Sequence, residues 1–297
     1  MPNFDVIVVG LGAMGSATAD HLSRRGLRVL GLDQHLPGHV YGASHGKSRF
    51  IREAYFERPE YVTLVQRAYR QWRDLEARAG QSLLEITGGL WMGPPGSRIV
   101  EGSLESARQH GLAHELLSAA DIRRRFGFHL ADSFSGLLEP NAGVLLPESC
   151  VAAQLAQAAS RGARLRHGEK VIRWSADAHG VRVETVEATF TAEKLVLTAG
   201  PWMAKILAAL NLPIVPSLVH YAHFEPAGPP DRFASLPLYL VDWEPGVYYY
   251  GVPHRPGEGL KFGLHNAVAP CDPDSVERTV PTAITDQFRD CLNQLLP

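Results

Sequence analysis

The chain has 297 residues, of which 45% are hydrophobic and 20% charged, as in an average globular protein with one large or two ordinary domains. Its net charge of -2 argues against nucleic acid as the main partner, because nucleic-acid-binding surfaces are strongly basic. The three cysteines, Cys150, Cys271 and Cys291, lie far apart and form no CxxC pair. This spacing excludes a disulfide scaffold and a thiolate zinc site, and we expect no bound metal.

The N-terminal stretch MPNFDVIVVGLGAMG is apolar, but it has no basic region and is interrupted by glycines after a few residues. It is therefore predicted to be neither a signal peptide nor a membrane span. No other apolar run reaches membrane length. We expect a cytoplasmic protein without a membrane partner.

The N-terminal residues predict a strand, a helix and a second strand in succession. Asp5–Val9 is a branched apolar run, which is typical of a parallel strand buried on both faces. Residues 16–26 have helical spacing and end at a glycine, and the apolar run that follows ends at Asp33. The sequence thus predicts the beginning of a Rossmann-type unit.

The turn between the first strand and the helix carries a GxGxxG motif formed by Gly10, Gly12 and Gly15. Gly10 permits a tight turn, Gly12 lets a pyrophosphate approach the backbone, and Gly15 lets helix and strand pack closely. The helix N-terminus offers unpaired N–H groups to phosphates, and Asp33 can accept hydrogen bonds from a ribose diol. The motif predicts a dinucleotide site but does not distinguish NAD from FAD.

Further elements are expected along the rest of the chain. A helix over 60–78 has one apolar face that we interpret as core, and from Ile214 onward short alternating strands between Pro/Gly turns indicate an antiparallel sheet. Between them we expect helices over 103–111, 119–126 and 150–161, strands within 88–97, 165–175 and 180–186, and a buried strand over 194–198 that ends in Ala199-Gly200-Pro201-Trp202. The Rossmann-like unit is therefore predicted to consist of separated segments.

The segment SHGKSRFIREAY, Ser44–Tyr55, gathers three cations and a histidine. A helix would put Arg49 and Arg52 on one side of one turn. By itself such a run is more often a solvated face than a clamp for an anion. The residues alone leave both interpretations open.

Six motifs together resemble one family. They are GLGAMG with Asp33, SHGKSRFIREAY, EPNAGVL from Glu139, TAGPW, YYGVP and LKFGLH, and they extend through essentially the whole chain. The sequence resembles the monomeric sarcosine oxidase and N-methyl-L-tryptophan oxidase family, which are FAD-dependent amine oxidases of the D-amino-acid oxidase superfamily. The resemblance implies a mixed α/β monomer with a discontinuous Rossmann-like FAD-binding domain, at 1–85 and 146–212. A substrate domain with a large antiparallel sheet is expected at 86–145 and 213–297.

The resemblance also implies site residues. Arg52 would bind the substrate carboxylate and Tyr250 would line the substrate pocket. Catalytic roles fall to Lys261, which activates O₂, to His265, which tunes substrate binding, and to Arg49 beside the flavin. From the residues alone, a surface lysine, a core histidine and a packed tyrosine remain the alternatives for Lys261, His265 and Tyr250. The cofactor-binding residues implied are Gly10, Gly12, Ala13, Met14, Gly15, Asp33, Gln34, Ser44, His45, Ser48, Arg49, Val171, Ala199, Gly200 and Trp202.

The chain departs from the family at its end, CLNQLLP. Family members continue with a segment that carries the flavin-linking cysteine, a GFSGHGFK-like motif with a second carboxylate-binding lysine, and the last strand and helix of the FAD domain. Since Cys150, Cys271 and Cys291 do not match that cysteine, we expect no covalent flavin link.

The sequence is compatible with three functions. The first is an FAD-dependent oxidase of secondary or N-methyl amino acids, whose partners are a small amino-acid substrate and O₂. The second is an NAD(P)-dependent dehydrogenase, and the third is a non-catalytic or apo FAD-binding protein. The arginine segment and TAGPW favour the first.

Overall fold

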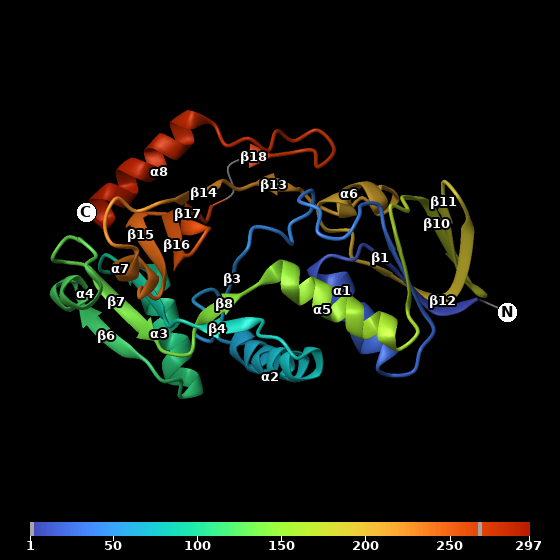
Figure 1. The fold of residues 1–297 in the computed structure, drawn as a ribbon, viewed down its shortest axis with the longest axis horizontal. Helices are drawn as coiled ribbons and strands as arrows, with labels where there is room; N and C mark the ends of the chain where they lie inside the picture. The colour runs from blue at the N-terminus through green and yellow to red at the C-terminus, as the bar shows by residue number, and fades with distance from the viewer. Residues whose placement is uncertain (1–2, 267–268) are drawn as a thin grey trace.

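The computed structural model describes residues 3–266 and 269–297. The molecule is elongated, with the N-terminus near one end and the C-terminus near the other (Figure 1). A large sheet lies toward each end, and helices and loops connect the two (Figure 1). This arrangement confirms the predicted mixed α/β class.

The first sheet contains the predicted Rossmann-like unit. Its strands lie in the order β10-β11-β12-β1-β2-β9. The strands from β12 to β9 are parallel to their neighbours, whereas β10 and β11 extend the sheet in antiparallel fashion. They are β1 (Phe4–Val9), β2 (Val29–Asp33), β9 (Arg164–His167), β10 (Val171–Asp177), β11 (Gly180–Thr185) and β12 (Thr189–Leu197).

Two helices cover one face of this sheet. Helix α1 (Ala13–Ser23) connects β1 to β2, and α5 (Pro147–Ser160) leads into β9. They pack against each other, and their apolar side chains share a core with Val8 and Val29. The other face of β1 is buried against residues of β11 and β12, so both faces of β1 are covered. This burial is why its sequence is continuously apolar.

The strand predicted over 194–198 is β12, but it is half-buried and not buried. Helices α1 and α5 pack mainly over β1, β2 and β9, and of this run Val196 packs against the core that they form. The interpretation of this apolar run as a fully buried strand was wrong because its helical cover is only partial.

The second sheet has seven strands in the order β14-β17-β16-β15-β5-β7-β6. All neighbours are antiparallel except β15 and β5, which run parallel, so the predicted antiparallel sheet is mixed at this one pair. The strands are β5 (Gly89–Gly93), β6 (Glu115–Ser118), β7 (Ser135–Glu139), β14 (Tyr221–Phe224), β15 (Leu238–Glu244), β16 (Val247–Arg255) and β17 (Gly259–Leu264).

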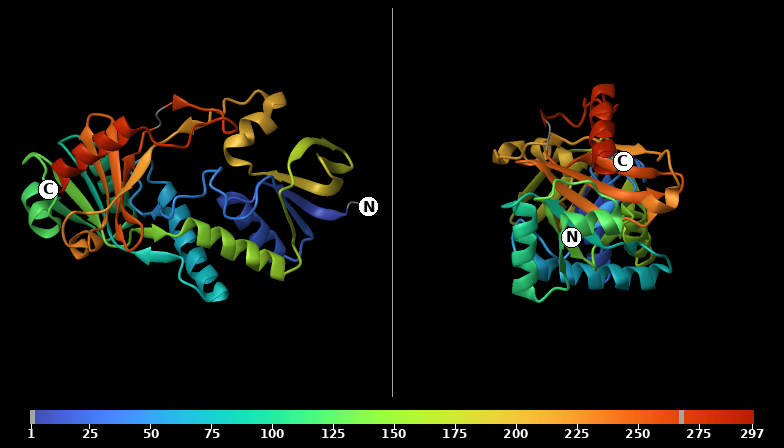
Figure 2. Two further views of the ribbon diagram at one scale, coloured as in Figure 1. Left: turned by 45° about the horizontal axis from the view of Figure 1, so that its top comes forward. Right: turned by 90° about the vertical axis from the view of Figure 1, so that its left-hand side faces the viewer.

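Helices surround this second sheet. Helix α8 (Thr282–Leu295) lies along its outside (Figure 2) and buries Phe288, Cys291 and Leu295 against Phe262 and Tyr249. The others are α3 (Arg98–His110), α4 (Ala119–Phe126) and the short α7 (Pro230–Ala234). Helices α4, α7 and α8 contribute to the largest core cluster of the described residues, whereas α3 packs in a separate cluster with Trp91 and Leu137.

Small elements link the two sheets. Strands β3 (Arg49–Ile51), β8 (Gly143–Leu145) and β4 (Leu84–Ile86) form a three-stranded sheet beside helix α2 (Tyr61–Ala79). Arg49 is therefore in a strand, and the helical geometry considered for Arg49 and Arg52 does not occur. A two-stranded ribbon, β13 (Ser217–Leu218) with β18 (Ala269–Pro270), and the short helix α6 (Met203–Ile206) complete the fold.

No helix of the described residues is long and apolar enough to cross a membrane. The two sheets draw their strands from 4–33 with 164–197 and from 89–139 with 221–264. The domain boundaries expected from the sequence remain a prediction.

Candidate active site

The glycine-rich turn forms an open cradle at the N-terminus of α1. Gly10 has φ +90°, and a Cβ there would lie 2.5 Å from the carbonyl oxygen of Thr198. Neither the conformation nor the space admits a side chain. The N-cap residue Gly12 makes no side-chain capping bond, and Ala13 and Met14 are exposed. The first turn of α1 is thus accessible to an anionic group, as the GxGxxG motif predicts.

Ser44 brings the arginine segment to this cradle. Its Oγ accepts a hydrogen bond of 2.9 Å from the Ala13 N–H, and a Cβ on Gly12 would lie 2.9 Å from the same oxygen. His45 is held in the adjoining turn by a 2.7 Å bond between Nδ1 and the Gly42 carbonyl. The segment 44–57 therefore starts beside the helix N-terminus.

Asp33 lies at the end of β2, next to the same turn. Its Oδ2 accepts a hydrogen bond of 2.7 Å from the Leu11 N–H, and its Oδ1 accepts one of 2.9 Å from the His35 N–H. The carboxylate is partly accessible, and its remaining lone pairs can accept further bonds. Gln34 follows directly and is also partly exposed.

The TAGPW segment lies across the turn from Asp33. A Cβ on Gly10 would lie 2.8 Å from the Cα of Ala199, so the two backbones touch. Gly200 has φ +53°, and the Trp202 ring lies 5.4 Å from the His35 ring. Val171, in contrast, begins β10, pairs with Thr185 and packs in the core of the sheet.

Lys261 is buried against the arginine segment. It is 3% exposed, and its Nζ donates to the Gly46 carbonyl at 2.9 Å and to the Ser48 Oγ at 3.2 Å. The same Nζ lies 4.1 Å from the centre of the Tyr221 ring. Gly46 has φ +106°, and a Cβ there would lie 2.7 Å from the Tyr221 hydroxyl. The predicted alternative of a surface lysine is wrong, since β17 presents this side chain inward.

Two charges set the electrostatics around Lys261. Burial, assisted by the positive charge of Arg49, lowers the pKa of Lys261 to about 8. Glu148 binds the Gly46 and Lys47 N–H groups at 2.8 and 3.1 Å and thereby holds the turn whose carbonyl meets Lys261. Burial opposes ionisation of Glu148, but these backbone hydrogen bonds keep its pKa below the usual value.

Arg49 and Tyr250 lie close enough to interact electrostatically. The Arg49 guanidinium donates to the carbonyls of Ser48, at 2.7 Å, and Ala43, at 2.5 Å. Tyr250 meets Phe50 edge-to-face with 5.7 Å between ring centres. Burial raises the pKa of Tyr250 to about 12, although the nearby positive charge of Arg49 opposes this rise.

Arg52 is held among aromatic rings and already binds a carboxylate. Its guanidinium carbon lies 4.7 Å from the Tyr55 ring, 4.6 Å from the Phe56 ring and 5.6 Å from the Trp91 ring. Its Nη2 donates to both oxygens of Glu57, at 2.7 and 2.8 Å. Within the described chain, Nε and Nη1 make no hydrogen bond, so one edge of the guanidinium stays available for a second carboxylate.

Glu139 anchors the backbone that carries Arg52. It is 1% exposed and accepts hydrogen bonds from the N–H groups of Glu53 and Ala54 and from Trp91 Nε1. Burial raises its pKa despite these donors. Because three donors would lose their partner with it, this carboxylate fixes the turn after β3.

His265 lies just beyond β17 and faces the other end of the segment. Its ring centre is 6.4 Å from that of Tyr248. His265 is exposed by its accessible surface, yet the protein atoms around the ring partly desolvate it, and this effect, followed by the positive charge of Arg52, lowers its pKa. Strand alternation predicted that Lys261 and His265 share a face, and both approach the segment 46–57.

Three acids of this region were not identified as site residues from the sequence: Glu57, Glu139 and Glu148. Glu139 belongs to the EPNAGVL motif, and its place at the end of an apolar strand was the signal that could have identified it. Glu148 lies in the first turn of α5, where acids are common because the helix dipole favours negative charge. In residues 3–266 and 269–297 no group of three or more His, Cys, Asp or Glu side chains could hold a metal ion.

The comparisons with known proteins agree with this geometry. Residues 5–297 match the DAO family model, described as FAD dependent oxidoreductase. The chain is 40% identical to monomeric sarcosine oxidase of Streptomyces avermitilis, covering 100% of this chain and 78% of that protein. It is 32% identical to N-methyl-L-tryptophan oxidase of Yersinia pestis, covering 89% and 71%.

Among solved structures, the chain is similar to the open form of NikD, an amino acid oxidase of nikkomycin biosynthesis. The TM-score is 0.83 at 30% identity, over 99% of this chain and 78% of that one. Glycine oxidase from Geobacillus kaustophilus, at 21% identity and a TM-score of 0.77, shares the fold. Family model, relatives and fold lead to one conclusion: the chain belongs to the DAO family of FAD-dependent oxidoreductases.

Proposed function

We propose that the protein is an FAD-dependent oxidase of secondary or N-methyl amino acids. One observation carries this proposal: a single segment, 44–57, connects the dinucleotide cradle to two buried cations. One of them would act on O₂ and the other would bind the substrate carboxylate. Near its start lies Lys261, bound to Gly46 and Ser48, and near its end lies Arg52 with a free guanidinium edge. Among the relatives, sarcosine and N-methyl-L-tryptophan oxidases have names that fit such a substrate.

The cradle fits FAD on its own geometry. Gly10 and Gly12 leave the backbone bare, the first turn of α1 is capped by a side chain only at the Ala13 N–H, by Ser44, and the Asp33 side chain stays partly accessible. Gly10, Gly12, Ala13, Met14 and Gly15 would face the pyrophosphate, and Asp33 with Gln34 the ribose. Further along, Ser44, His45, Ser48, Arg49, Val171, Ala199, Gly200 and Trp202 complete the proposed set. Bound FAD would supply the redox chemistry, taking a hydride from the substrate C–H bond next to nitrogen and passing two electrons to O₂.

The protein's own residues would orient the substrate and stabilise the charge that develops during the reaction. Arg52 would grip the substrate carboxylate, and Tyr250 and His265 would bound the space in front of it, which fixes the C–H bond in position. The ammonium group of Lys261 is buried, and there it would stabilise the negative charge that develops on O₂ during its reduction. The oxidised substrate is an imine, which water hydrolyses, and two protons with two electrons convert O₂ to H₂O₂.

We further propose that FAD is held without a covalent bond. Cys150 and Cys291 are buried in apolar clusters, and burial raises the pKa of each thiol to about 12. A thiol that stays protonated is a poor nucleophile. Cys271 has its backbone N–H bound to the Pro216 carbonyl and lies outside the glycine-rich cradle. A monomer located in the cytoplasm, with the domain boundaries given above, completes the proposal.

The test is to purify the protein and record its visible spectrum, its peroxide production and the fate of its flavin. We expect a yellow protein that makes H₂O₂ from sarcosine or another N-methyl amino acid and releases its flavin into the supernatant on acid precipitation. NAD(P)-dependent turnover without flavin would instead support a nicotinamide dehydrogenase. A folded protein that binds no flavin, or flavin retained in the acid pellet, would contradict the proposal or its non-covalent part.

Replacing Asp33 with alanine should weaken FAD binding by about tenfold to a hundredfold, because one charge-assisted hydrogen bond contributes about 1.5–3 kcal/mol. The measurement is FAD titration of apoprotein by flavin fluorescence. Asp177→Ala is the matched control, since Asp177, like Asp33, accepts the N–H two residues on, but at the far hairpin of the same sheet. Equal FAD affinity in the two variants would refute the ribose contact.

A further inference from the structure

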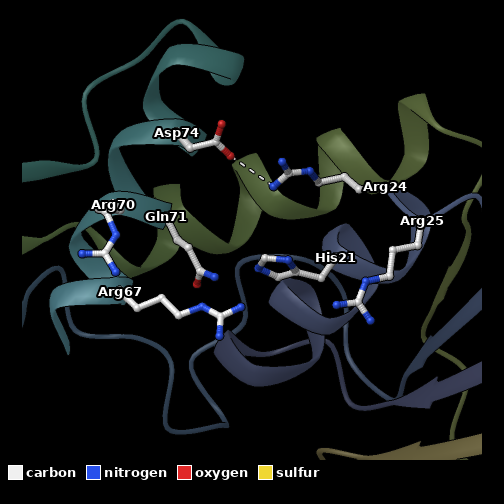
Figure 3. A pocket seen from close by; sticks show the side chains of 7 residues that line it. All are labelled: His21, Arg24, Arg25, Arg67, Arg70, Gln71 and Asp74. Carbon is white, nitrogen blue, oxygen red and sulfur yellow. Dashed lines mark hydrogen bonds and ion pairs between the residues drawn. The ribbon is translucent and has the colours of Figure 1, made fainter. Parts of the chain in front are cut away.

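A cationic groove lies between α1 and α2, outside the site described above. Its volume is about 520 Å³, and it is an open surface groove whose arginines and Asp74 are exposed. The C-terminal end of α1 contributes His21, Arg24 and Arg25, and α2 contributes Arg67, Arg70, Gln71 and Asp74. Figure 3 shows Arg67, His21 and Arg25 extending into the same space between the two helices.

The groove has more positive charge than its own acids neutralise. Four guanidinium groups face one carboxylate, and that carboxylate, Asp74, is already shared by Arg24 at 3.1 Å and Arg78 at 3.0 Å. In the described chain, the guanidinium groups of Arg25, Arg67 and Arg70 have no hydrogen bond or ion pair. Three cations therefore lack a partner within one groove.

A second arginine-rich groove in the same molecule shows the ordinary situation. It is lined by Arg123, Arg124, Arg125 and Arg232. Arg124 pairs with Asp121 at 2.8 Å and Arg125 with Glu115 at 2.7 Å, while the other two donate to backbone carbonyls at 3.2 Å. Arginine content alone thus does not distinguish the first groove, but its unpaired guanidinium groups do.

Helix electrostatics explain only part of this cluster. Arg24 and Arg25 follow the C-terminal end of α1, where the helix dipole favours cations. Arg67 and Arg70 lie in the middle of α2, where the dipole has little effect. They are three residues apart on the same face, and such like-charged pairs destabilise a helix. A bound anion would remove this repulsion.

We propose that this groove binds a small molecule carrying two or more linked phosphate groups. Guanidinium groups bind phosphate oxygens in pairs, and several of them around one groove fit several adjacent phosphates. Gln71 and His21 add further hydrogen-bonding groups. Among the described residues, His21 is the one aromatic side chain that lines the groove, so it offers little surface on which a base would stack. The ligand is therefore recognised by its oligophosphate.

The groove is separate from the flavin cradle. The cradle is at the N-terminal end of α1 and the groove at its C-terminal end, about 16 Å away along an eleven-residue helix. Because FAD itself carries two linked phosphates, the cradle is filled with FAD first and unbound FAD is removed before the titration. The test can be made on the FAD-saturated protein, and it does not depend on which substrate is oxidised.

The experiment is isothermal titration of the FAD-loaded protein, freed of unbound FAD, with inorganic tripolyphosphate at about 0.15 M salt. We expect saturable binding of one tripolyphosphate per chain, weaker binding of orthophosphate, and an affinity at least about tenfold lower in the double variant Arg67→Gln/Arg70→Gln. Arg124→Gln, in the second arginine-rich groove, is the matched control and should bind like the unchanged protein.

Three outcomes would overturn the proposal: no saturable binding, equal losses in the double variant and in Arg124→Gln, or undiminished binding in the double variant. The same chemistry is carried by a free oligophosphate and by the headgroup of a polyphosphorylated lipid. Sedimentation with vesicles that contain such a lipid, with and without competing tripolyphosphate, distinguishes these sources. Binding to the vesicles that resists tripolyphosphate would contradict recognition in this groove.

Discussion

Replacing Lys261 with methionine should slow the reaction with O₂ by about 100-fold to 1000-fold, the usual effect of removing one preorganised charge at a reacting oxygen. Oxidation of the substrate should change far less, because Arg52 and Tyr250 remain in place. Stopped-flow kinetics that separate anaerobic flavin reduction from reoxidation by O₂ will measure both. Methionine keeps the length of the side chain and leaves Ser48 and Gly46 without their cationic partner.

The pH dependence supplies an independent check on Lys261. Since its pKa is lowered to about 8, the amine is charged below that pH and neutral above it. The rate of reoxidation should therefore fall as the pH rises through about 8, and this fall should disappear in Lys261→Met. Lys194→Met is the control, because Lys194 is an exposed lysine of β12. A reoxidation rate that is normal in Lys261→Met, or lowered equally in Lys194→Met, would exclude the assigned role.

Replacing Arg52 with glutamine should raise the KM for amino-acid substrates by about tenfold to a hundredfold, while flavin binding stays unchanged. The reason is the loss of a charge-assisted bond to the substrate carboxylate. An N-methyl amine without a carboxylate should be oxidised equally well, or equally poorly, by both proteins. Arg58→Gln is the matched control, since Arg58 is an exposed arginine that follows the same segment directly.

Substitution of Glu57 should have the opposite effect on KM. In the structure it occupies Nη2 of Arg52, so an incoming carboxylate competes with it. Glu57→Gln should lower the KM for the same substrates, by about fivefold at most because Glu57 is partly exposed. If Arg52→Gln leaves KM unchanged, or if Glu57→Gln raises it as strongly as Arg52→Gln does, Arg52 does not bind the substrate carboxylate.

The dinucleotide unit was predictable because its information is local. Gly10, Gly12, Gly15 and Asp33 lie within one strand–helix–strand unit, and each has a backbone or hydrogen-bonding task that only its residue type fulfils. The alternation that put Lys261 and His265 on one face is equally local, being a property of a single strand. The roles assigned to Lys261, His265 and Tyr250 came from the family resemblance, since spacing alone left core or surface residues as alternatives.

The sequence by itself determined the mixed α/β class, the glycine-rich turn with its acid, and the segment 44–55 as one with several cations. Only the tertiary structure decided which of those cations are buried and what faces them. Glu148 meets the Gly46 turn across about 100 residues, Glu139 meets the turn after β3 across about 85, and the arginines of α1 and α2 meet across about 45. Such pairings follow from how whole elements pack, because hydrophobic burial places the elements and their polar side chains then lie wherever the backbone has carried them.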